Sequence, residues 1–472
     1  MKKIYKGNKF FNIICFIGII ISFFWSIYNL NKFDKIKLNY DGAYYNQLLY
    51  ADLAATWNIA DKFKKELDQG NNFFSSIPSY ERFLLPSIIV GFYYHLINKD
   101  IYTNSNDGKL VIKEKNFKIN ILLIQIFFYF FTLYLFYTEI KKKNNGLILK
   151  IVIFFLCLEP SLLQWHSSFW SESIFLSLML LLFFFLLKNS QNIFINLSIG
   201  IIVGLMFIQR GVSFLYIFPV LVYFILVFKN NFKPLIFVLI GFILFIFAIG
   251  YNNYKKTSYF YILPWKHQYS SYYHYFAHDL VAHRKNINSR DAKKFLENEE
   301  KKWILENKIN TQSIADISKN INYRNKIFLE EVSKSPLYFS KLFLKRVIVM
   351  SIIHPFWVNQ HFYFDRTDPQ AKNNPKEYYN KNLYKNLPYS FFIYFFTIIG
   401  LFQIFKEILK KREISTINKF YIFNFFSILY FILISGLWGN PKYFAPCMIS
   451  ISFFFSIGFK YIFDKYKYKL NF

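Results

Sequence analysis

The sequence consists largely of apolar blocks of about twenty residues, separated by short polar tracts. A helix of about twenty residues is long enough to cross the hydrocarbon core of a bilayer. The composition supports the same interpretation, because 54% of the 472 residues are hydrophobic and 23% are aromatic, unlike an ordinary soluble domain. The sequence therefore predicts an all-α polytopic membrane protein.

Ten of these blocks are long enough to cross a membrane. The first follows a lysine-rich N-terminus, Met1 to Phe10, and no small-residue cleavage site comes after it, so we expect an uncleaved first span. The other nine predicted spans lie at about 118–138, 147–165, 168–188, 193–209, 212–229, 233–251, 389–407, 419–437 and 443–464.

Two shorter apolar segments, 83–97 and 340–357, either cross the membrane or lie along its surface. Short inner loops carry an excess of lysine and arginine. If 83–97 lies along the surface, the lysines at 141–143 fall on the inner side with the N-terminus; if it crosses, they fall outside. The same treatment of 340–357 places the basic tract 406–419 inside. We therefore predict about ten spans, and crossing by both segments would make twelve.

This arrangement leaves two long segments on the outer face, at about 32–117 and 252–388. Apolar residues recur among polar ones there at helical spacing, which predicts helices at the membrane surface. We expect a first membrane module at 1–251 with seven spans, a mostly helical outer domain at 252–388, and a second membrane module at 389–472 with three spans. Individual surface helices are predicted over 44–63, 83–97, 291–308 and 311–333, and a helix start at Ser335-Pro336.

The distribution of charge separates membrane binding from nucleic-acid binding. The net charge is +29, but many lysines flank apolar spans, where they meet anionic lipid headgroups. No nucleic-acid recognition motif accompanies the charge, so we predict no nucleic-acid partner. The three cysteines, Cys15, Cys157 and Cys447, lie in or beside apolar spans, which argues against a disulfide framework and a cysteine metal site.

Asp41 is the first candidate catalytic residue. It lies a few residues past the first span, at the level where membrane meets water, in a tract rich in tyrosine and followed by Gly42. A carboxylate that is partly desolvated at this boundary can take a proton from an attacking hydroxyl group. We predict that Asp41 is a general base, and a purely structural turn or cap is the alternative.

A polar turn, Trp165 to Glu172, joins two long apolar blocks on the predicted outer face. Glu172 begins the second block, where a carboxylate either caps a helix or points into a shared cavity. We predict a functional role in a cavity for Glu172. For His166, packing or hydrogen bonding at the membrane boundary is favoured over catalysis.

Three cations at the ends of apolar blocks are candidates for binding a phosphate group: Arg210, Lys442 and, with less support, Arg82. A phosphate leaving group requires cationic hydrogen-bond donors at membrane depth. The alternative for Arg210 and Lys442 is that each side chain extends from a helix end toward the headgroups.

The order and sidedness of these residues resemble the GT-C superfamily of membrane glycosyltransferases, including its mannosyltransferases and aminoarabinose transferases. The resemblance covers nearly the whole chain in layout. Its motifs are Tyr40-Asp41-Gly42, Ser171-Glu172, Arg210-Gly211 and a closing Lys442-Tyr443-Phe444-Ala445-Pro446, where relatives often carry an Arg-Tyr-Pro-like tract.

Two features of the sequence disfavour a metal site. Many members of the superfamily follow the loop aspartate with a second acid, whereas this chain has Gly42. His274 and His278 have the spacing of two helical metal ligands, but no glutamate follows His274 and the stretch is aromatic. We therefore predict no cofactor, and a divalent metal is possible but not favoured.

The resemblance implies an integral membrane glycosyltransferase that moves a hexosyl or pentosyl group from a polyprenyl-phosphate carrier to a lipid, glycan or protein acceptor. It implies a site on the non-cytoplasmic face, here the periplasmic side of a bacterial inner membrane, and an inverting reaction. The expected catalytic residues are Asp41 and Glu172. The expected substrate-binding residues are Arg210, Lys442, Arg82, His166 and Tyr443.

Two other functions fit the apolar composition. One is a polysaccharide polymerase or ligase that acts on polyprenyl-linked glycans, and the other is a lipid or solute transporter. Transporters tend to have inverted repeats and ionisable residues or broken helices near the middle of the membrane. Here the notable acids lie at span ends and one outer loop exceeds a hundred residues, which favours chemistry at the surface.

Overall fold

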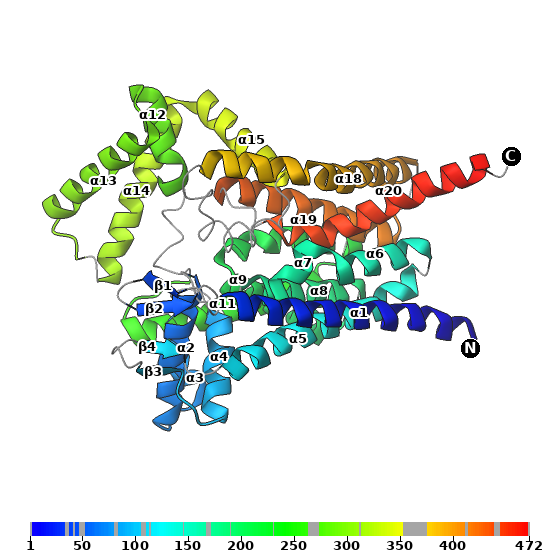
Figure 1. Ribbon diagram of the computed structural model, residues 1–472, viewed down its shortest axis with the longest axis horizontal. Helices are drawn as coiled ribbons and strands as arrows, with labels where there is room; N and C mark the ends of the chain where they lie inside the picture. The colour runs from blue at the N-terminus through cyan, green and yellow to red at the C-terminus, as the bar shows by residue number, and fades with distance from the viewer. Residues whose placement is uncertain are drawn as a thin grey trace.

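The computed structural model is a bundle of long helices with two additional segments at one end of it (Figure 1). Both chain termini lie at the opposite end (Figure 1). The structure describes residues 2–33, 37–40, 43–46, 52–79, 84–104, 110–112, 115–144, 146–166, 171–188, 190–229, 231–262, 273–310, 313–352, 375–410, 414–438 and 444–470.

Each of the ten predicted spans overlaps a described helix of the bundle, but fewer than ten of these helices qualify as spans by length and composition. Among the described residues, six are long and apolar enough to cross a membrane, and a bent pair, α6 and α7, would make a seventh. The prediction of a helical polytopic membrane protein is confirmed. The bundle elements are α1 (Lys2–Phe33), α5 (Lys115–Lys143), α6 (Leu147–Leu158), α7 (Pro160–His166), α8 (Ser171–Lys188), α9 (Ile193–Gln209), η2 (Gly211–Tyr216), α10 (Ile217–Phe228), α11 (Lys233–Thr257), α18 (Pro375–Lys410), α19 (Thr416–Trp438) and α20 (Cys447–Leu470).

The bundle has apolar side chains on its outside as well as in its core. Trp165, Tyr216 and Phe183 are fully buried between helices, whereas Phe127 and Phe218 are more than half exposed. Such exposed aromatic residues are expected where a helix borders lipid rather than water. Apolar residues on all sides of these helices are thus explained by protein contacts on one side and lipid on the other.

Glycines allow two pairs of helices to approach backbone to backbone. A Cβ atom added to Gly400 of α18 would lie 1.9 Å from the carbonyl oxygen of Phe454 in α20, and one added to Gly458 would lie 1.9 Å from that of Phe396. Gly200 of α9 and Gly241 of α11 make a similar approach. Small residues at helix contacts in membranes permit this close packing.

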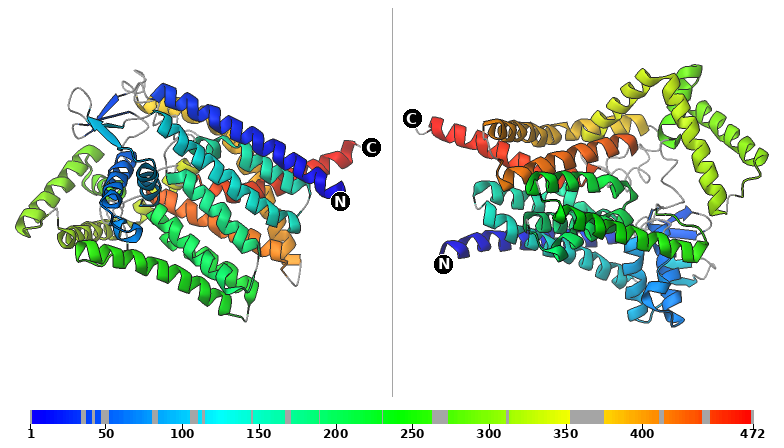
Figure 2. Two further views of the ribbon diagram at one scale, coloured as in Figure 1. Left: turned by 90° about the horizontal axis from the view of Figure 1, so that it is seen from below. Right: turned by 180° about the vertical axis from the view of Figure 1, so that it is seen from behind.

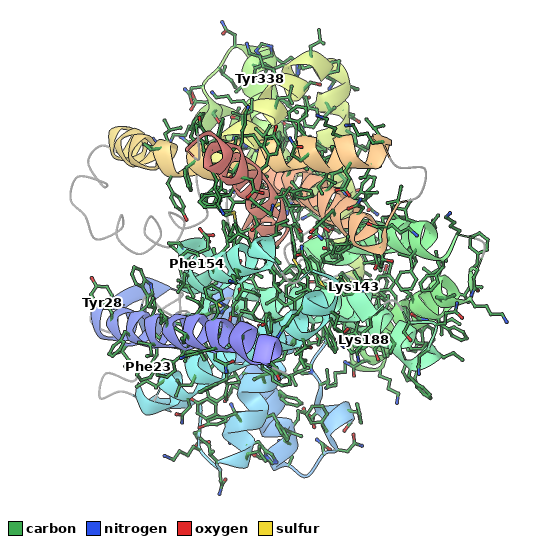
Figure 3. All side chains as sticks on the ribbon, turned by 90° about the vertical axis from the view of Figure 1, so that its right-hand side faces the viewer. Phe23, Tyr28, Lys143, Phe154, Lys188 and Tyr338 are labelled. Carbon is green, nitrogen blue, oxygen red and sulfur yellow. The ribbon has the colours of Figure 1, made fainter. Side chains whose placement is uncertain are left out.

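The end of the bundle that carries the termini also carries basic residues (Figure 3). Figure 3 looks onto this end and labels Lys143, the last residue of α5, and Lys188, the last residue of α8. Because α5 and α8 both end there, their first residues lie toward the two additional segments. This placement agrees with the charge argument that put the lysines at 141–143 on the same side as the N-terminus.

The first additional segment combines two short hairpins with helices that lie across the direction of the bundle (Figures 1 and 2). Strands β1 and β2 pair antiparallel with Tyr40 opposite Ala43, and β3 pairs with β4. The predicted helix over 44–63 was wrong at its start, because residues 43–46 form strand hydrogen bonds with 37–40. The elements are β1 (Lys37–Tyr40), β2 (Ala43–Asn46), α2 (Asp52–Asp68), α3 (Phe73–Ser76), α4 (Leu84–Leu96), β3 (Tyr102–Asn104) and β4 (Leu110–Ile112).

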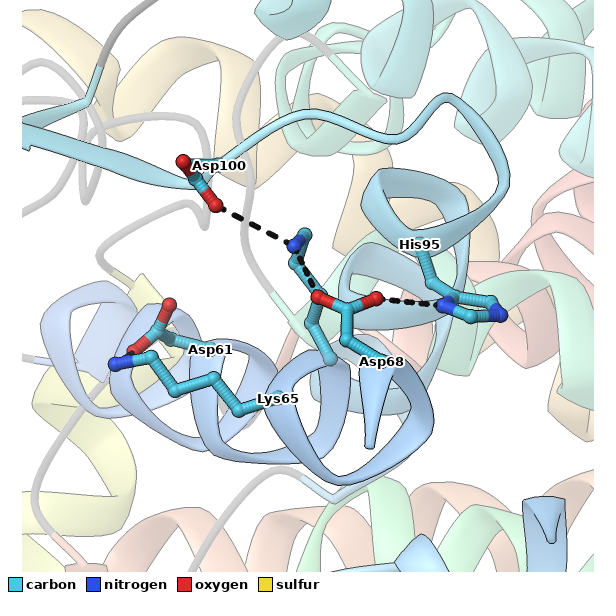
Figure 4. A network of polar contacts seen from close by, with 6 residues as sticks. Asp61, Lys65, Asp68, His95 and Asp100 are labelled. Carbon is cyan, nitrogen blue, oxygen red and sulfur yellow. Dashed lines mark hydrogen bonds and ion pairs between the residues drawn. The ribbon is translucent and has the colours of Figure 1, made fainter. Parts of the chain in front are cut away.

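A polar network connects α2 to α4 (Figure 4). The Asp68 carboxylate binds the ammonium of Lys64 and lies 2.8 Å from Nδ1 of His95, while Lys64 also reaches Asp100 at 3.4 Å. Burial alone would raise the pKa of Asp68, but its hydrogen bonds with Lys64 and His95 outweigh this effect and lower it. The network therefore fixes α4 against α2 above the membrane spans.

The second additional segment consists of helices that project beyond the bundle (Figure 2). It has a small core of its own, formed by Tyr273, Ala277, Val281, Ala292 and Leu296. The helices predicted over 291–308 and 311–333 and the start at Pro336 agree with the structure. The elements are η3 (Tyr273–Ala277), α12 (His278–Lys285), α13 (Ser289–Glu306), α14 (Ile314–Lys334) and α15 (Pro336–Ile352).

Ion pairs join these helices to one another. Both carboxylate oxygens of Glu331 in α14 accept hydrogen bonds from Arg284 in α12, at 2.8 and 2.9 Å. Glu300 of α13 accepts one from Arg324 at 2.8 Å, and Asp279 accepts one from Arg346 at 2.9 Å. Bidentate arginine–carboxylate contacts of this kind fix geometry as well as charge.

Acidification is expected to loosen this segment through Glu331. Burial raises the pKa of Glu331, but hydrogen bonds with Arg284 and Lys334 lower it further, so its folded pKa lies below the usual 4.5. The stabilisation is therefore present above pH 4.5 and is lost as the pH falls through the lower folded value. We expect a loss of about 1 kcal/mol, since Arg284 is partly exposed to solvent.

Hydrogen exchange of the α12 and α14 peptides, corrected for intrinsic rates, would measure this loss between pH 6 and pH 3. The variant Glu331→Gln should exchange faster already at pH 6 and should change less on acidification. Equal pH responses in the two proteins would show that Glu331 is not the responsible group.

Candidate functional site

Three of the predicted site residues lie together in the described part of the chain: His166, Glu172 and Arg210. They occupy the junction between α7 and α8 and the junction between α9 and η2. The remaining predicted residues lie outside the described residues; these are Asp41, Arg82, Lys442 and Tyr443.

Glu172 and Arg210 form a buried ion pair. Nη1 of Arg210 lies 3.2 Å from Oε1 of Glu172, and their side chains are 4% and 0% exposed, respectively. A side chain that extended from the helix end to the headgroups would be exposed, so the burial of Arg210 contradicts that alternative. The ring of Phe175 lies 6.0 Å from the guanidinium carbon, within the range of a cation–π contact.

Local backbone structure places the two charges at the same end of the bundle. Glu172 lies in the first turn of α8, where the helix dipole favours a carboxylate. Arg210 ends α9 with an extended backbone, and its carbonyl oxygen accepts hydrogen bonds from the hydroxyl and the N–H of Ser213, at 2.6 and 2.9 Å. Since α8 and α9 are consecutive and packed against each other, the start of one meets the end of the other.

His166 is connected to this ion pair through a serine. Its Nδ1 lies 2.8 Å from the hydroxyl oxygen of Ser173, the residue that follows Glu172. The His166 ring also contacts the ring of Tyr129 with centroids 4.1 Å apart, and all of these side chains are fully buried. His166 therefore forms a hydrogen bond and a ring contact inside the bundle, and its expected role in substrate binding stays a prediction.

Sequence reasoning missed three buried polar residues near this group: Tyr129, Glu159 and Ser173. Glu159 had a recognisable signal, because a glutamate followed by proline inside an apolar block marks both a break in the helix and an ionisable group at membrane depth. Tyr129 and Ser173 lie within long apolar blocks, and their sequence neighbours gave no comparable signal.

The site contains the elements of anion chemistry. Arginine keeps its positive charge in proteins, and its fork of N–H groups suits phosphate oxygens. A carboxylate that holds such a cation in a buried position orients the guanidinium in advance, so the side chain does not have to reorganise when an anion binds. No group of three potential metal ligands is found in the part of the chain that the structure describes, and the side chain of His274 lies outside that part.

The comparisons with known proteins give a distant likeness. No family model matches the sequence, and no curated protein matches it. One similar solved structure is the archaeal oligosaccharyltransferase AglB from Archaeoglobus fulgidus, in complex with an inhibitory peptide and a dolichol-phosphate. The identity is 12% and the TM-score is 0.44, over 97% of this chain and 51% of that chain. The chain therefore spans about half the length of AglB, and a likeness this remote assigns no activity.

Proposed function

We propose that this protein is an integral membrane glycosyltransferase that transfers a sugar from a polyprenyl-phosphate carrier to an acceptor hydroxyl at the membrane surface. The observation that carries the proposal is the buried Glu172–Arg210 pair, 3.2 Å apart, at the junctions of consecutive spans. A fixed cation at this depth suits the phosphate of a lipid carrier. The resemblance in motif order supports the sugar as the transferred group.

The proposed reaction is a single displacement at the anomeric carbon of the sugar. The acceptor oxygen forms a bond to that carbon while the bond to the carrier phosphate breaks, and the phosphate leaves with the bonding electrons. Asp41 takes the proton from the acceptor hydroxyl. Arg210 and Lys442 stabilise the negative charge that develops on the phosphate. One inversion at the anomeric carbon follows from one displacement.

Glu172 has a supporting role in this scheme. Its carboxylate holds the Arg210 guanidinium in place between α8 and α9, so that the cation is oriented before the carrier arrives. His166 fixes Ser173 and hence the first turn of α8. We propose the outer face of a bacterial inner membrane as the location, because the two long segments lie at the end opposite the basic residues.

The substitution Asp41→Asn is expected to reduce sugar transfer by at least about 100-fold, because an amide cannot accept the proton. The measurement is transfer by the purified protein from a panel of polyprenyl-phosphate sugars to a mixed lipid and glycan acceptor pool. A matched control is Asp107→Asn, which changes the Asp-Gly pair that joins β3 and β4 and should leave transfer unchanged. Full activity of Asp41→Asn would exclude the base role.

One observation favours transport as a second candidate function. The α6–α7 pair is bent by 44° and carries the buried Glu159 at the bend, as expected for the broken helices of transporters. Flux of labelled polyprenyl phosphates across proteoliposomes, measured without an acceptor, distinguishes the two functions. Flux in a protein that shows no transfer with any donor would support the transporter.

A further inference from the structure

The bent span α6–α7 places a carboxylate at membrane depth outside the Glu172–Arg210 pair. Glu159 lies between the two helices and is 4% exposed. An ionisable residue in such a position is costly and usually has a function. Backbone that leaves the helical path at this depth also needs partners for its polar groups.

The two oxygens of the Glu159 carboxylate bind different parts of the protein. Oε2 accepts hydrogen bonds from the Ser161 hydroxyl and from the N–H of Leu162 at 3.0 Å, which caps the start of α7. Oε1 accepts a hydrogen bond from the hydroxyl of Tyr389 in α18 at 3.1 Å. A cap alone requires only the first oxygen, so the contact with α18 has to be explained separately.

The other end of α7 is His166. Since α7 has seven residues, it is about 10 Å long, and a shift at Glu159 moves His166 with it. Tyr129 connects the end of α6 to the end of α7, because its hydroxyl donates to the carbonyl oxygen of Leu156 in α6 at 2.9 Å and its ring contacts His166 in α7. His166 in turn contacts Ser173 beside Glu172.

We propose that Glu159 is a positioning residue of the Glu172–Arg210 site, which fixes α7 and connects it to α18. The expected change in the kinetics of sugar transfer rests on the proposed function. The expected coupling of α7 to α18 does not. Through Tyr389, α18 helps to hold α7, the short helix that ends at His166. The hydrogen bond between Tyr389 and Glu159 therefore couples the position of α18 to the geometry of the Glu172–Arg210 site.

The test uses full-length protein in lipid nanodiscs and the variants Tyr389→Phe, Glu159→Gln and Glu159→Ala. Tyr389→Phe removes the contact with α18 and leaves the cap intact. The matched control is Glu139→Gln, a buried glutamate of α5 that binds Lys142 at the opposite end of the bundle. Hydrogen exchange of peptides covering 160–166, the thermal midpoint, and the kcat and KM of transfer are measured for each.

For Tyr389→Phe we expect exchange in 160–166 to rise about two- to tenfold, the range that one hydrogen bond accounts for. We expect kcat to fall about tenfold or more with KM within about twofold, as misplacement of a site predicts. Glu159→Gln should lie between Tyr389→Phe and wild type, and Glu139→Gln should match wild type in transfer and in exchange of 160–166.

Wild-type exchange and kcat in both Tyr389→Phe and Glu159→Gln would overturn the proposal, as would an equal change in Glu139→Gln. If Glu159→Ala does not fold, the other two variants still decide. If wild type transfers no sugar from any donor, the proposed function fails, and the exchange of 160–166 alone confirms or rejects the structural coupling.

Discussion

Replacement of Arg210 by methionine is expected to destabilise the fold by about 3–5 kcal/mol. Methionine has a similar length but no charge, so Glu172 would remain buried without its cation, and this is the most costly way to break a buried ion pair. Urea or thermal unfolding in detergent micelles measures the effect. The Arg210→Met variant is expected to unfold at a lower temperature than wild type and to transfer no sugar.

Three further variants separate the effect of the ion pair on stability from its effect on sugar transfer. Arg210→Met combined with Glu172→Gln should recover most of the stability, because neither charge then remains buried alone. Lys293→Met removes the partner of Glu297 from an ion pair in which both side chains are exposed, and it should cost less than about 1 kcal/mol. Arg210→Lys keeps the charge but not the planar fork, so its transfer should fall more than its stability. Wild-type stability of Arg210→Met would contradict the buried pair.

Replacement of Gly400 by valine is expected to separate α18 from α20. An added Cβ atom would lie 1.9 Å from the Phe454 carbonyl oxygen, and backbone cannot yield as the end of a side chain can. Overpacking of a well-packed contact costs about 1–3 kcal/mol and sometimes more, and the facing Gly458 leaves no slack on the other side. The expected result is a thermal midpoint many degrees below that of wild type and poor yield from membranes.

A smaller substitution and a distant glycine serve as controls. Gly400→Ala should already lower the midpoint, because the clash concerns the Cβ atom itself. Gly146→Ala should have little effect, since the closest atom to its added Cβ is Oδ1 of Asn144 at 3.8 Å. If Gly400→Ala and Gly146→Ala unfold at the same temperature, α18 and α20 do not meet at these glycines.

The spans could be predicted from sequence because their signal is length. A helix needs an apolar run of about the length of 118–138 to cross a bilayer, and such a run can be recognised without knowing which helices pack against it. The hairpins were missed, although an Asp-Gly pair between short β-rich runs is a strong hairpin signal. Asp41-Gly42 lies between β1 and β2, and Asp107-Gly108 lies between β3 and β4.

The contacts within the candidate site were only partly predictable. Alternation of spans places Glu172 at the start of α8 and Arg210 at the end of α9 on one side of the membrane, so their common level follows from topology. Their direct contact depends on how each helix is rotated about its axis, and apolar residues on all sides of a span leave that rotation undetermined. The partner of Glu159 was unpredictable for the same reason, because Tyr389 belongs to a helix far away in the sequence.

The common position of the two chain ends has a practical consequence (Figure 1). A fluorescent protein fused after residue 470 and an affinity tag placed before residue 2 would share one aqueous compartment. Neither would obstruct the end of the bundle at which the two long segments lie. Energy transfer between labels at the two ends would therefore report an intact bundle in living cells, without any knowledge of the substrate.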